Sequence, residues 1–198
     1  MNARVILAGV LGGIVMFIWT SIAHTVLPLG EAGIREIPNE KAVLDVMEQN
    51  IGNTEGLYIF PGFGLGPEAT REQKSEAKKQ WVEKYSSTPV GLLMYRPVGR
   101  RFAIGRWMGI EFATELVEAI LVVLLLAQTR LTTFGGRVAF VTAAGILAAI
   151  ATNVSYWNWY GFARAYTTSY MFIEVVGFFC VGIVGGLVLG RRSPQTAG

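Results

Sequence analysis

Four long runs of apolar residues, separated by polar stretches, dominate the pattern of the chain. A helix needs about 20 mostly apolar residues to cross the hydrocarbon core of a bilayer. The runs that reach this length cover residues 5–26, 107–127, 138–157 and 169–190, and none of them contains Lys, Arg or Pro. The pattern therefore predicts an all-α membrane protein with four transmembrane helices.

The first run has a second interpretation. Arg4, the apolar stretch after it and the small residues of Ser21–Ile22–Ala23 also fit a cleavable secretory signal peptide. The run is longer than the apolar core of about 7–15 residues that signal peptides have. We therefore interpret residues 5–26 as a transmembrane helix, with the signal peptide as the alternative.

The polar segment between the first two runs, residues 28–104, is too long to be a simple connector. Its polar and apolar positions predict helices at 39–52 and 66–87. Two short apolar runs, at 56–60 and 90–95, are bounded by Gly or Pro and predict a pair of strands. We expect a small α+β cap outside the cytoplasm, the alternative being that both short runs lie along the membrane surface.

Basic residues indicate the orientation, because Lys and Arg accumulate on the cytoplasmic side of short loops. With the N-terminus inside, the cytoplasmic pieces hold no acidic residue and five arginines: Arg4, Arg130, Arg137, Arg191 and Arg192. The short loop on the other side holds only Arg164. Arg100, Arg101 and Arg106 also fall on that side, but long segments cross largely regardless of charge. Both termini, with a tail at 191–198, are therefore expected in the cytoplasm.

Composition narrows the class further. Only 16% of the 198 residues are charged and the mean hydropathy is +0.44, whereas soluble domains carry about 25% charged residues. The net charge of +3 is small and the basic residues are scattered, which excludes a nucleic-acid-binding surface. Cys180 and His24 are the only cysteine and histidine, so the chain forms neither an internal disulfide nor a bis-histidine haem site. No conventional catalytic motif is present, so the sequence points away from an enzyme and names no cofactor.

Acidic residues inside the predicted spans are the strongest functional signal. Four of the 14 carboxylates lie there: Glu111, Glu115, Glu118 and Glu174. At about 100° per residue the first three lie within roughly 60° of one another, so they share one face of a helix. His24 and Asn153 reach the same outer half of the bundle from two other helices. A carboxylate near the bilayer centre costs about 2.5–3.5 kcal/mol, and such residues generally face a protein interior.

This cluster of His24, Asn153 and four glutamates has three interpretations. Three carboxylates cannot all ionise cheaply in a low-dielectric interior unless a cation lies among them. The cluster is therefore a structural polar network, a site that binds a cation or small polar ligand, or part of a proton or ion path. The Glu-x-x-His pairs of a di-metal bundle are absent, but His24, Glu111, Glu115 and Glu174 also offer ligands to one metal ion.

Small residues at helical spacing predict where helices pack closely. Gly9 and Gly13 form one small-xxx-small pair, and Gly182, Gly186 and Gly190 form a longer ladder. Their partner is either another helix of the chain or a second copy. The aromatic stretch at residues 155–170 fits an interfacial belt, the alternative being a wall over a ligand or a docking surface.

One resemblance adds a cellular setting. The stretch FIWTSIAHTVLPLG, followed at a distance by GLYIFPG, is similar to a family of small uncharacterised bacterial inner-membrane proteins. The matching residues lie in the first third of the chain and are Trp19, His24, Leu27, Pro28, Gly56, Tyr58 and Pro61. The resemblance implies the inner membrane of a bacterium as the location and implies no activity.

The expected function follows from the spans and the polar cluster. We expect a non-catalytic accessory or binding protein of the inner membrane, as a subunit of a larger complex. Its partners would be membrane lipids and other membrane subunits, or further copies of the chain through the glycine-rich faces. The alternative is a small transporter, or a proton-coupled or metal-dependent membrane enzyme, that uses the same carboxylates.

Overall fold

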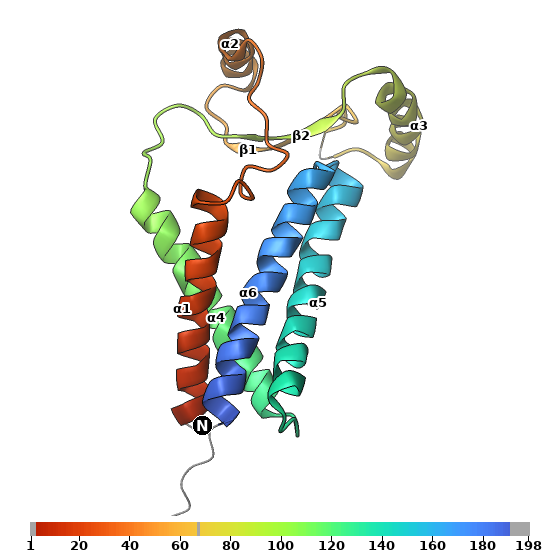
Figure 1. The fold of residues 1–198 in the computed structure, drawn as a ribbon. Coiled ribbons are helices and arrows are strands. Elements are labelled where there is room, and N and C mark those ends of the chain that lie inside the picture. Colours follow the sequence, from red (N-terminus) through yellow and green to blue (C-terminus); the bar gives the residue numbers. More distant parts are fainter. Residues whose placement is uncertain (1–2, 67, 191–198) are drawn as a thin grey trace, which may run out of the picture. The chain divides into compact units, whose positions relative to one another are not determined.

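The computed structural model describes residues 3–66 and 68–190 and divides the chain into two compact units. The first, which we call the helical unit, combines residues 1–34 with residues 103–198. The second, the inserted unit, runs from residue 35 to residue 102 between them. Figure 1 labels the helices and strands of both units.

Four long helices make up the helical unit: α1 (Ala3–Thr25), α4 (Ile104–Ala127), α5 (Phe134–Tyr160) and α6 (Arg164–Gly190). Each of them overlaps one of the four apolar runs. Local chemistry sets the ends of α5, because the Thr133 side chain caps its start by accepting a hydrogen bond from the Gly136 N–H over 3.1 Å. Gly161, in the left-handed conformation, ends the helix. The predicted tail at 191–198 lies outside the described residues.

Three of these helices, α1, α5 and α6, are long and apolar enough to cross a membrane, which is consistent with a membrane protein. The predicted number of apolar spans, four, is therefore corrected to three among the described residues. The exception is α4. Every stretch of 18 residues within α4 contains Glu111, Glu115 and Glu118, and these three charges lower its apolar character.

Consecutive helices of this unit run in opposite directions. Arg4, near the start of α1, and Val188, near the end of α6, line the same surface groove. A ring atom of Phe134, at the start of α5, would lie 2.7 Å from a Cβ built on Gly186 of α6. Figure 1 shows the same arrangement, with α4 crossing α1 obliquely. The chain therefore passes back and forth along one bundle.

Glycines on α1 allow the close approach of α4. A Cβ on Gly9 would lie 2.8 Å from the Cα of Ile120, and one on Gly13 would lie 2.8 Å from the Cα of Leu116. Real Cβ atoms almost never come this close, so α1 has no room for a larger residue at either position. Gly9 precedes Gly13 on α1, whereas its partner Ile120 follows Leu116 on α4, so the two helices are antiparallel.

The glycine ladder of α6 lies against α5 of the same chain. Its pairs are Gly182 with Val138, Gly186 with Phe134, and Gly190 with Arg137. The closest approach at any glycine between α5 and α6 occurs at Gly145, a position that the sequence pattern did not indicate. A Cβ on Gly145 of α5 would lie 2.4 Å from the Cβ of Phe178.

An apolar core fills the bundle on one side of the carboxylates. Its buried members on α4 and α6 include Ala119, Val123, Phe178 and Val181, which all follow Glu118 or Glu174 in the chain. α1 adds Val5, Ala8 and Met16 to it, and α5 adds Val141. The glutamates therefore lie beyond the apolar core, toward the end of the bundle where α4 and α6 begin.

The inserted unit contains two helices and two strands: α2 (Glu40–Ile51), β1 (Gly56–Phe60), α3 (Arg71–Ser87) and β2 (Gly91–Tyr95). The two short apolar runs thus form an antiparallel pair of strands, with Tyr58 opposite Leu93, as the first of their two interpretations predicts. α3 begins later than predicted because Thr70 caps it. The Thr70 hydroxyl accepts from the Gln73 N–H, and the Gln73 side chain accepts from the Thr70 N–H.

No described residue of the inserted unit is buried. Aromatic contacts organise the unit instead of a core. The Trp81 ring stacks on Phe63 with centroids 5.4 Å apart, and its Nε1 donates to the Pro61 carbonyl over 2.7 Å. The unit therefore leaves many of its apolar side chains at the surface.

Candidate binding site at the carboxylate cluster

The buried stripe of α4 carries a glutamate into the helical unit. The buried residues of α4 recur every three or four positions and are Glu115, Ala119, Val122, Val123 and Leu126. This spacing keeps them on one face of the helix. Glu111, one turn before Glu115, is exposed, and Glu118, one turn after it, is half-buried. The face begins with three carboxylates and continues with aliphatic residues.

Glu115 is the centre of the cluster. It is only 4% exposed, which is rare for a carboxyl group. The Thr20 side chain of α1 forms a hydrogen bond with it. Its Oε2 atom, however, is buried and has no hydrogen-bond partner within the described part of the chain. Because buried polar atoms are almost always hydrogen-bonded, this oxygen calls for a donor that the described residues do not supply.

Three further carboxylates lie within electrostatic range of this site. Glu111 and Glu118 both act on Glu115, and Glu118 acts on Glu174 of α6. None of the four takes part in an ion pair with a described residue. The site therefore gathers four carboxyl groups with no basic side chain of the described residues paired to them.

Asn153 joins the cluster from α5. Its Nδ2 donates to Oε2 of Glu174 over 3.3 Å and to the Ala149 carbonyl over 3.1 Å. Asn153 is buried and Glu174 is half-buried. This contact connects α5 to α6 at the level of the carboxylates, so residues of all four helices meet at one end of the bundle.

His24 contacts two neighbours of the carboxylates, Thr20 and Tyr170. Its Nδ1 donates to the Thr20 carbonyl over 2.9 Å, because a carbonyl oxygen only accepts. The imidazole meets the Tyr170 ring edge to face, with centroids 5.5 Å apart. Glu111 lies close enough to Tyr170 to act on it electrostatically. One turn of α1 therefore contacts both the carboxylates of α4 and an aromatic residue of α6.

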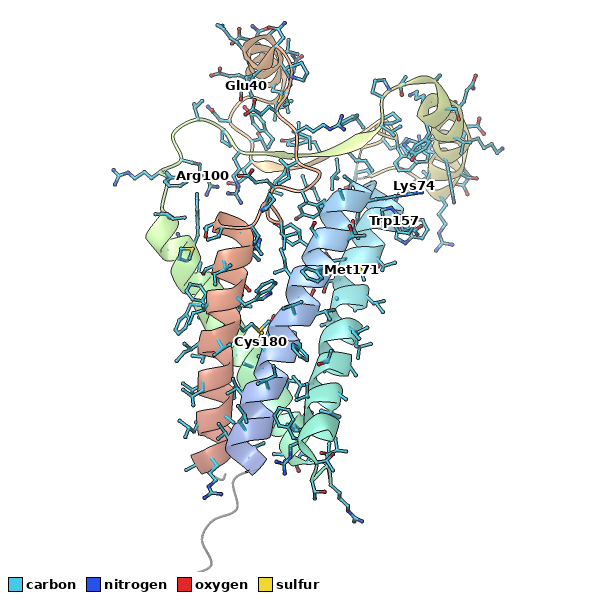
Figure 2. All side chains as sticks on the ribbon, viewed as in Figure 1. Glu40, Lys74, Arg100, Trp157, Met171 and Cys180 are labelled. Carbon is cyan, nitrogen blue, oxygen red and sulfur yellow. The ribbon has the colours of Figure 1, made fainter. Side chains whose placement is uncertain are left out.

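Aromatic side chains continue from this point toward the end of α5. Successive ring contacts, with centroids 4.2 to 5.4 Å apart, connect Tyr156, Phe162, Tyr166 and Tyr170. Trp159 of the same stretch is exposed, as is Trp157, which Figure 2 labels near the end of α5. The aromatic stretch thus has two parts, one directed outward and one continuous with the ring that meets His24.

The candidate metal ligands do not assemble. Among residues 3–66 and 68–190, no three His, Cys, Asp or Glu side chains come close enough together to hold a metal ion. His24 is turned toward Thr20 and Tyr170, and Glu174 toward Asn153. The metal interpretation of His24, Glu111, Glu115 and Glu174 therefore has no support in this arrangement.

Two residues of the site were missed by the sequence reasoning. Thr20 lies one turn before His24 on α1, and that spacing is the signal that places it on the same face of the helix. Tyr170, a member of the aromatic stretch, lies one turn before Glu174, and that spacing places both residues on the same face of α6. Figure 2 labels Met171 and Cys180 on α6, and Glu174 lies between them along the helix.

Comparison with protein-family models, curated proteins and solved structures finds no match to this chain. The resemblance of residues 19–61 to a bacterial inner-membrane family gains no support from them. The chemistry of the carboxylate cluster therefore rests on its own geometry.

Proposed function

We propose that the chain is a multi-pass membrane protein in which α4 crosses the membrane together with the three apolar helices. α4 starts at the end of the bundle where α1 stops, and α5 starts at the opposite end, so α4 covers the length between them. At ~1.5 Å per residue its 24 residues extend about 36 Å, which exceeds a hydrocarbon core of about 30 Å. The contact with α1 keeps Glu115 in the protein interior, where intramembrane carboxylates belong.

The proposed function is the binding of a small cationic ligand at Thr20, Glu111, Glu115, Glu118 and Glu174, which we call the carboxylate site. The observation that carries the proposal is the buried Oε2 of Glu115, which has no partner among the described residues. A cation with N–H groups would donate to such an oxygen once the side chains that cover it move apart, and it would offset the charge of any ionised glutamate nearby. The protein is thus a binding or accessory protein rather than an enzyme.

An organic ammonium ion suits the carboxylate site better than a metal ion does. A metal needs several ligands around one point, and the described residues offer no group of three. A primary ammonium group carries three N–H donors, and carboxylate and hydroxyl oxygens can accept these as charge-assisted hydrogen bonds. The rings of His24 and Tyr170, close to Thr20 and Glu111, provide an apolar and π-rich surface for its carbon atoms.

A purely structural network is the second interpretation. Two hydrogen bonds favour it, one between Thr20 and Glu115 and one between Asn153 and Glu174. A network that only holds helices together would satisfy its buried members, because an unpaired buried oxygen makes the network costly. The interpretation therefore explains two contacts and leaves Oε2 of Glu115 unexplained.

A transporter or proton-coupled enzyme, the other alternative, needs titratable groups along a path through the bundle. α4 carries no such side chain from Ala119 to Ala127. The neighbouring core is formed by aliphatic and aromatic residues such as Val123, Val181 and Phe178. Binding at one end of the bundle therefore fits the charge distribution better than transport through it.

The proposed location is the inner membrane of a bacterium, with both termini in the cytoplasm. Four crossings return the chain to the side on which it began, and the arginines of the short segments favour that side as the cytoplasm. Exposed aliphatic residues along α1, such as Leu7, Leu11 and Ile18, would contact lipid, further membrane subunits or another copy. Membership of a larger complex is part of this proposal.

Thermal unfolding of the full-length protein in detergent tests the proposed function. Methylammonium chloride is the probe, and sodium chloride at equal ionic strength controls for screening. We expect methylammonium to raise the unfolding temperature of the wild type, because a ligand that binds only the folded state stabilises it. Glu115→Gln should lose this response, whereas Glu36→Gln, an exposed position of the inserted unit, should keep it. Equal responses of the wild type to the two salts would overturn the proposal.

A further inference from the structure

The ribbon formed by β1 and β2 exposes one aliphatic face. Side chains alternate between the two faces of a strand, and the register places Leu57 opposite Met94 and Ile59 opposite Leu92. These four side chains therefore lie on the same face, which we call the aliphatic face. Leu57 is 62% exposed, Ile59 53% and Met94 69%.

The opposite face of the ribbon carries two tyrosines that contact each other and form hydrogen bonds within the unit. The Tyr58 and Tyr95 rings meet edge to face with centroids 6.4 Å apart. Their hydroxyls donate to the carbonyls of Thr54, over 2.9 Å, and Gly52, over 3.0 Å. The two faces thus differ in kind, because one carries two hydrogen-bonded tyrosines together with Phe60 and the other presents only Leu, Ile and Met side chains.

The inserted unit does not cover the aliphatic face itself. Neither α2 nor α3 contains a buried residue, and no described residue of the unit is buried. Leu57, Ile59 and Met94 therefore have no cover within the described part of the unit. A second chain is a poor fit, because two strands of five residues form a patch of only about 17 by 10 Å, against the ~800 Å² per partner of a stable interface.

The covalent connection limits how far this ribbon can lie from the start of α4. β2 ends at Tyr95 and α4 begins at Ile104, so the chain between them extends at most about 30 Å. The same segment is basic, because residues 96–103 hold three arginines and no acidic residue. Two of them, Arg96 and Arg100, share the single carboxylate of Glu55, so the segment keeps a positive charge.

We propose that the aliphatic face rests on an anionic lipid surface, with its side chains among the acyl chains and the nearby arginines at the phosphate groups. Apolar side chains beside a basic segment are the combination by which protein segments bind the membrane interface. The inserted unit is then held on the membrane and does not extend freely into solution. The inference rests on the membrane placement in the proposed function and is independent of the ligand at the carboxylate site.

Depth measurements on the full-length protein test this proposal. Cys180→Ala removes the only cysteine, and nitroxide labels are then attached at Leu57→Cys and Met94→Cys. Ser86→Cys, an exposed position of α3, serves as the control. The protein is reconstituted into vesicles of phosphatidylglycerol and phosphatidylcholine. Collisions of each label with oxygen, which partitions into lipid, are compared with collisions with a water-soluble nickel complex.

The expected result is that labels at 57 and 94 collide preferentially with oxygen and the label at 86 with the nickel complex. In vesicles of phosphatidylcholine alone the first two should lie less deep, because the arginines lose their anionic partners. Free collision with the nickel complex at 57 and 94 would overturn the proposal. Protection from both reagents with dipolar broadening between copies would also overturn it, since a second chain would then cover the face. Ile59→Cys repeats the measurement if one substitution disturbs the strand.

Discussion

Thr20 on α1 forms a side-chain hydrogen bond with the buried carboxyl group of Glu115 on α4. The backbone carbonyl of the same threonine accepts a hydrogen bond from Nδ1 of His24 over 2.9 Å. Thr20 therefore serves both sides of the carboxylate site, with its hydroxyl toward α4 and its carbonyl toward the imidazole. A change of its side chain should therefore alter the stability of the contact between α1 and α4.

Thr20→Val keeps the shape of the side chain and removes the hydroxyl. We expect it to lower the free energy of unfolding by about 1–3 kcal/mol, because Glu115 stays buried and loses its hydrogen-bond partner. Reversible unfolding in mixed micelles measures this value. Thr25→Val is the matched control: its hydroxyl donates to the Ser21 carbonyl at an exposed position, so the change should stay within about 0.5 kcal/mol. Equal losses in the two variants would contradict the role given to Thr20.

Gly13→Ala should destabilise the bundle even though alanine favours a helix by about 1 kcal/mol over glycine. The added Cβ would lie 2.8 Å from the Cα of Leu116, and this backbone atom moves only if α4 moves. Overpacking of this kind costs about 1–3 kcal/mol. Gly109→Ala on α4, where nothing lies within 4 Å, should show the helix-propensity gain alone. The same unfolding assay would refute the close α1–α4 contact if both variants were stabilised equally.

The contact between Asn153 and Glu174 should appear as a coupling energy. We expect a double-mutant cycle of Asn153→Leu and Glu174→Leu, each of which removes one partner of the hydrogen bond, to give a favourable interaction of about 0.6 kcal/mol, and at most about 1.7 kcal/mol, as for other polar contacts between membrane helices. Additive losses would show that the 3.3 Å hydrogen bond contributes nothing to stability. Asn153→Leu combined with Glu118→Gln provides a comparison pair without a direct hydrogen bond.

The start of α3 should depend on pH through Glu72. A hydrogen bond from its own backbone N–H, and then one from the Thr70 side chain, lower the pKa of Glu72 from its usual value of 4.5. A group whose pKa is lowered on folding stabilises the folded state above its unfolded pKa, and the effect is lost as pH falls through the lower, folded value. Hydrogen exchange of amides 72–75, corrected for its intrinsic pH dependence, should therefore accelerate below about pH 4.5. Glu72→Gln should remove this acceleration and Glu83→Gln, at the other end of α3, should keep it.

The parts of the fold that depend on local sequence were predictable. Apolar length identified the helices of the helical unit, and the spacing of Glu111, Glu115 and Glu118 indicated one shared face because helical rotation is a property of the segment itself. The number of apolar spans was overestimated for the same reason. The second half of α4 is strongly apolar, but the three glutamates before it lower the apolar character of the helix as a whole.

Which residues of different helices contact one another depends on tertiary packing, and the sequence of a single helix does not predict it. The bond between Thr20 and Glu115 joins two helices that are far apart in the chain, and so does the contact of Gly13 with Leu116. Gly145 lies in a run of small residues without a regular glycine spacing, so its contact with Phe178 left no pattern. Asn153 and Glu174 were placed at one depth by residue rise alone, whereas their hydrogen bond depends on how α5 and α6 pack.

Equilibrium dialysis with radiolabelled methylammonium tests the central claim most directly, because it counts ligand bound per protein. The account predicts saturable binding of a single ligand to each wild-type chain, no saturable binding to Glu115→Gln, and unchanged binding to Thr25→Val. Tetramethylammonium should compete poorly, since it has no N–H group to donate to Oε2 of Glu115. Saturable binding that persists unchanged in Glu115→Gln, or none to the wild type, would contradict the assignment of the carboxylate site.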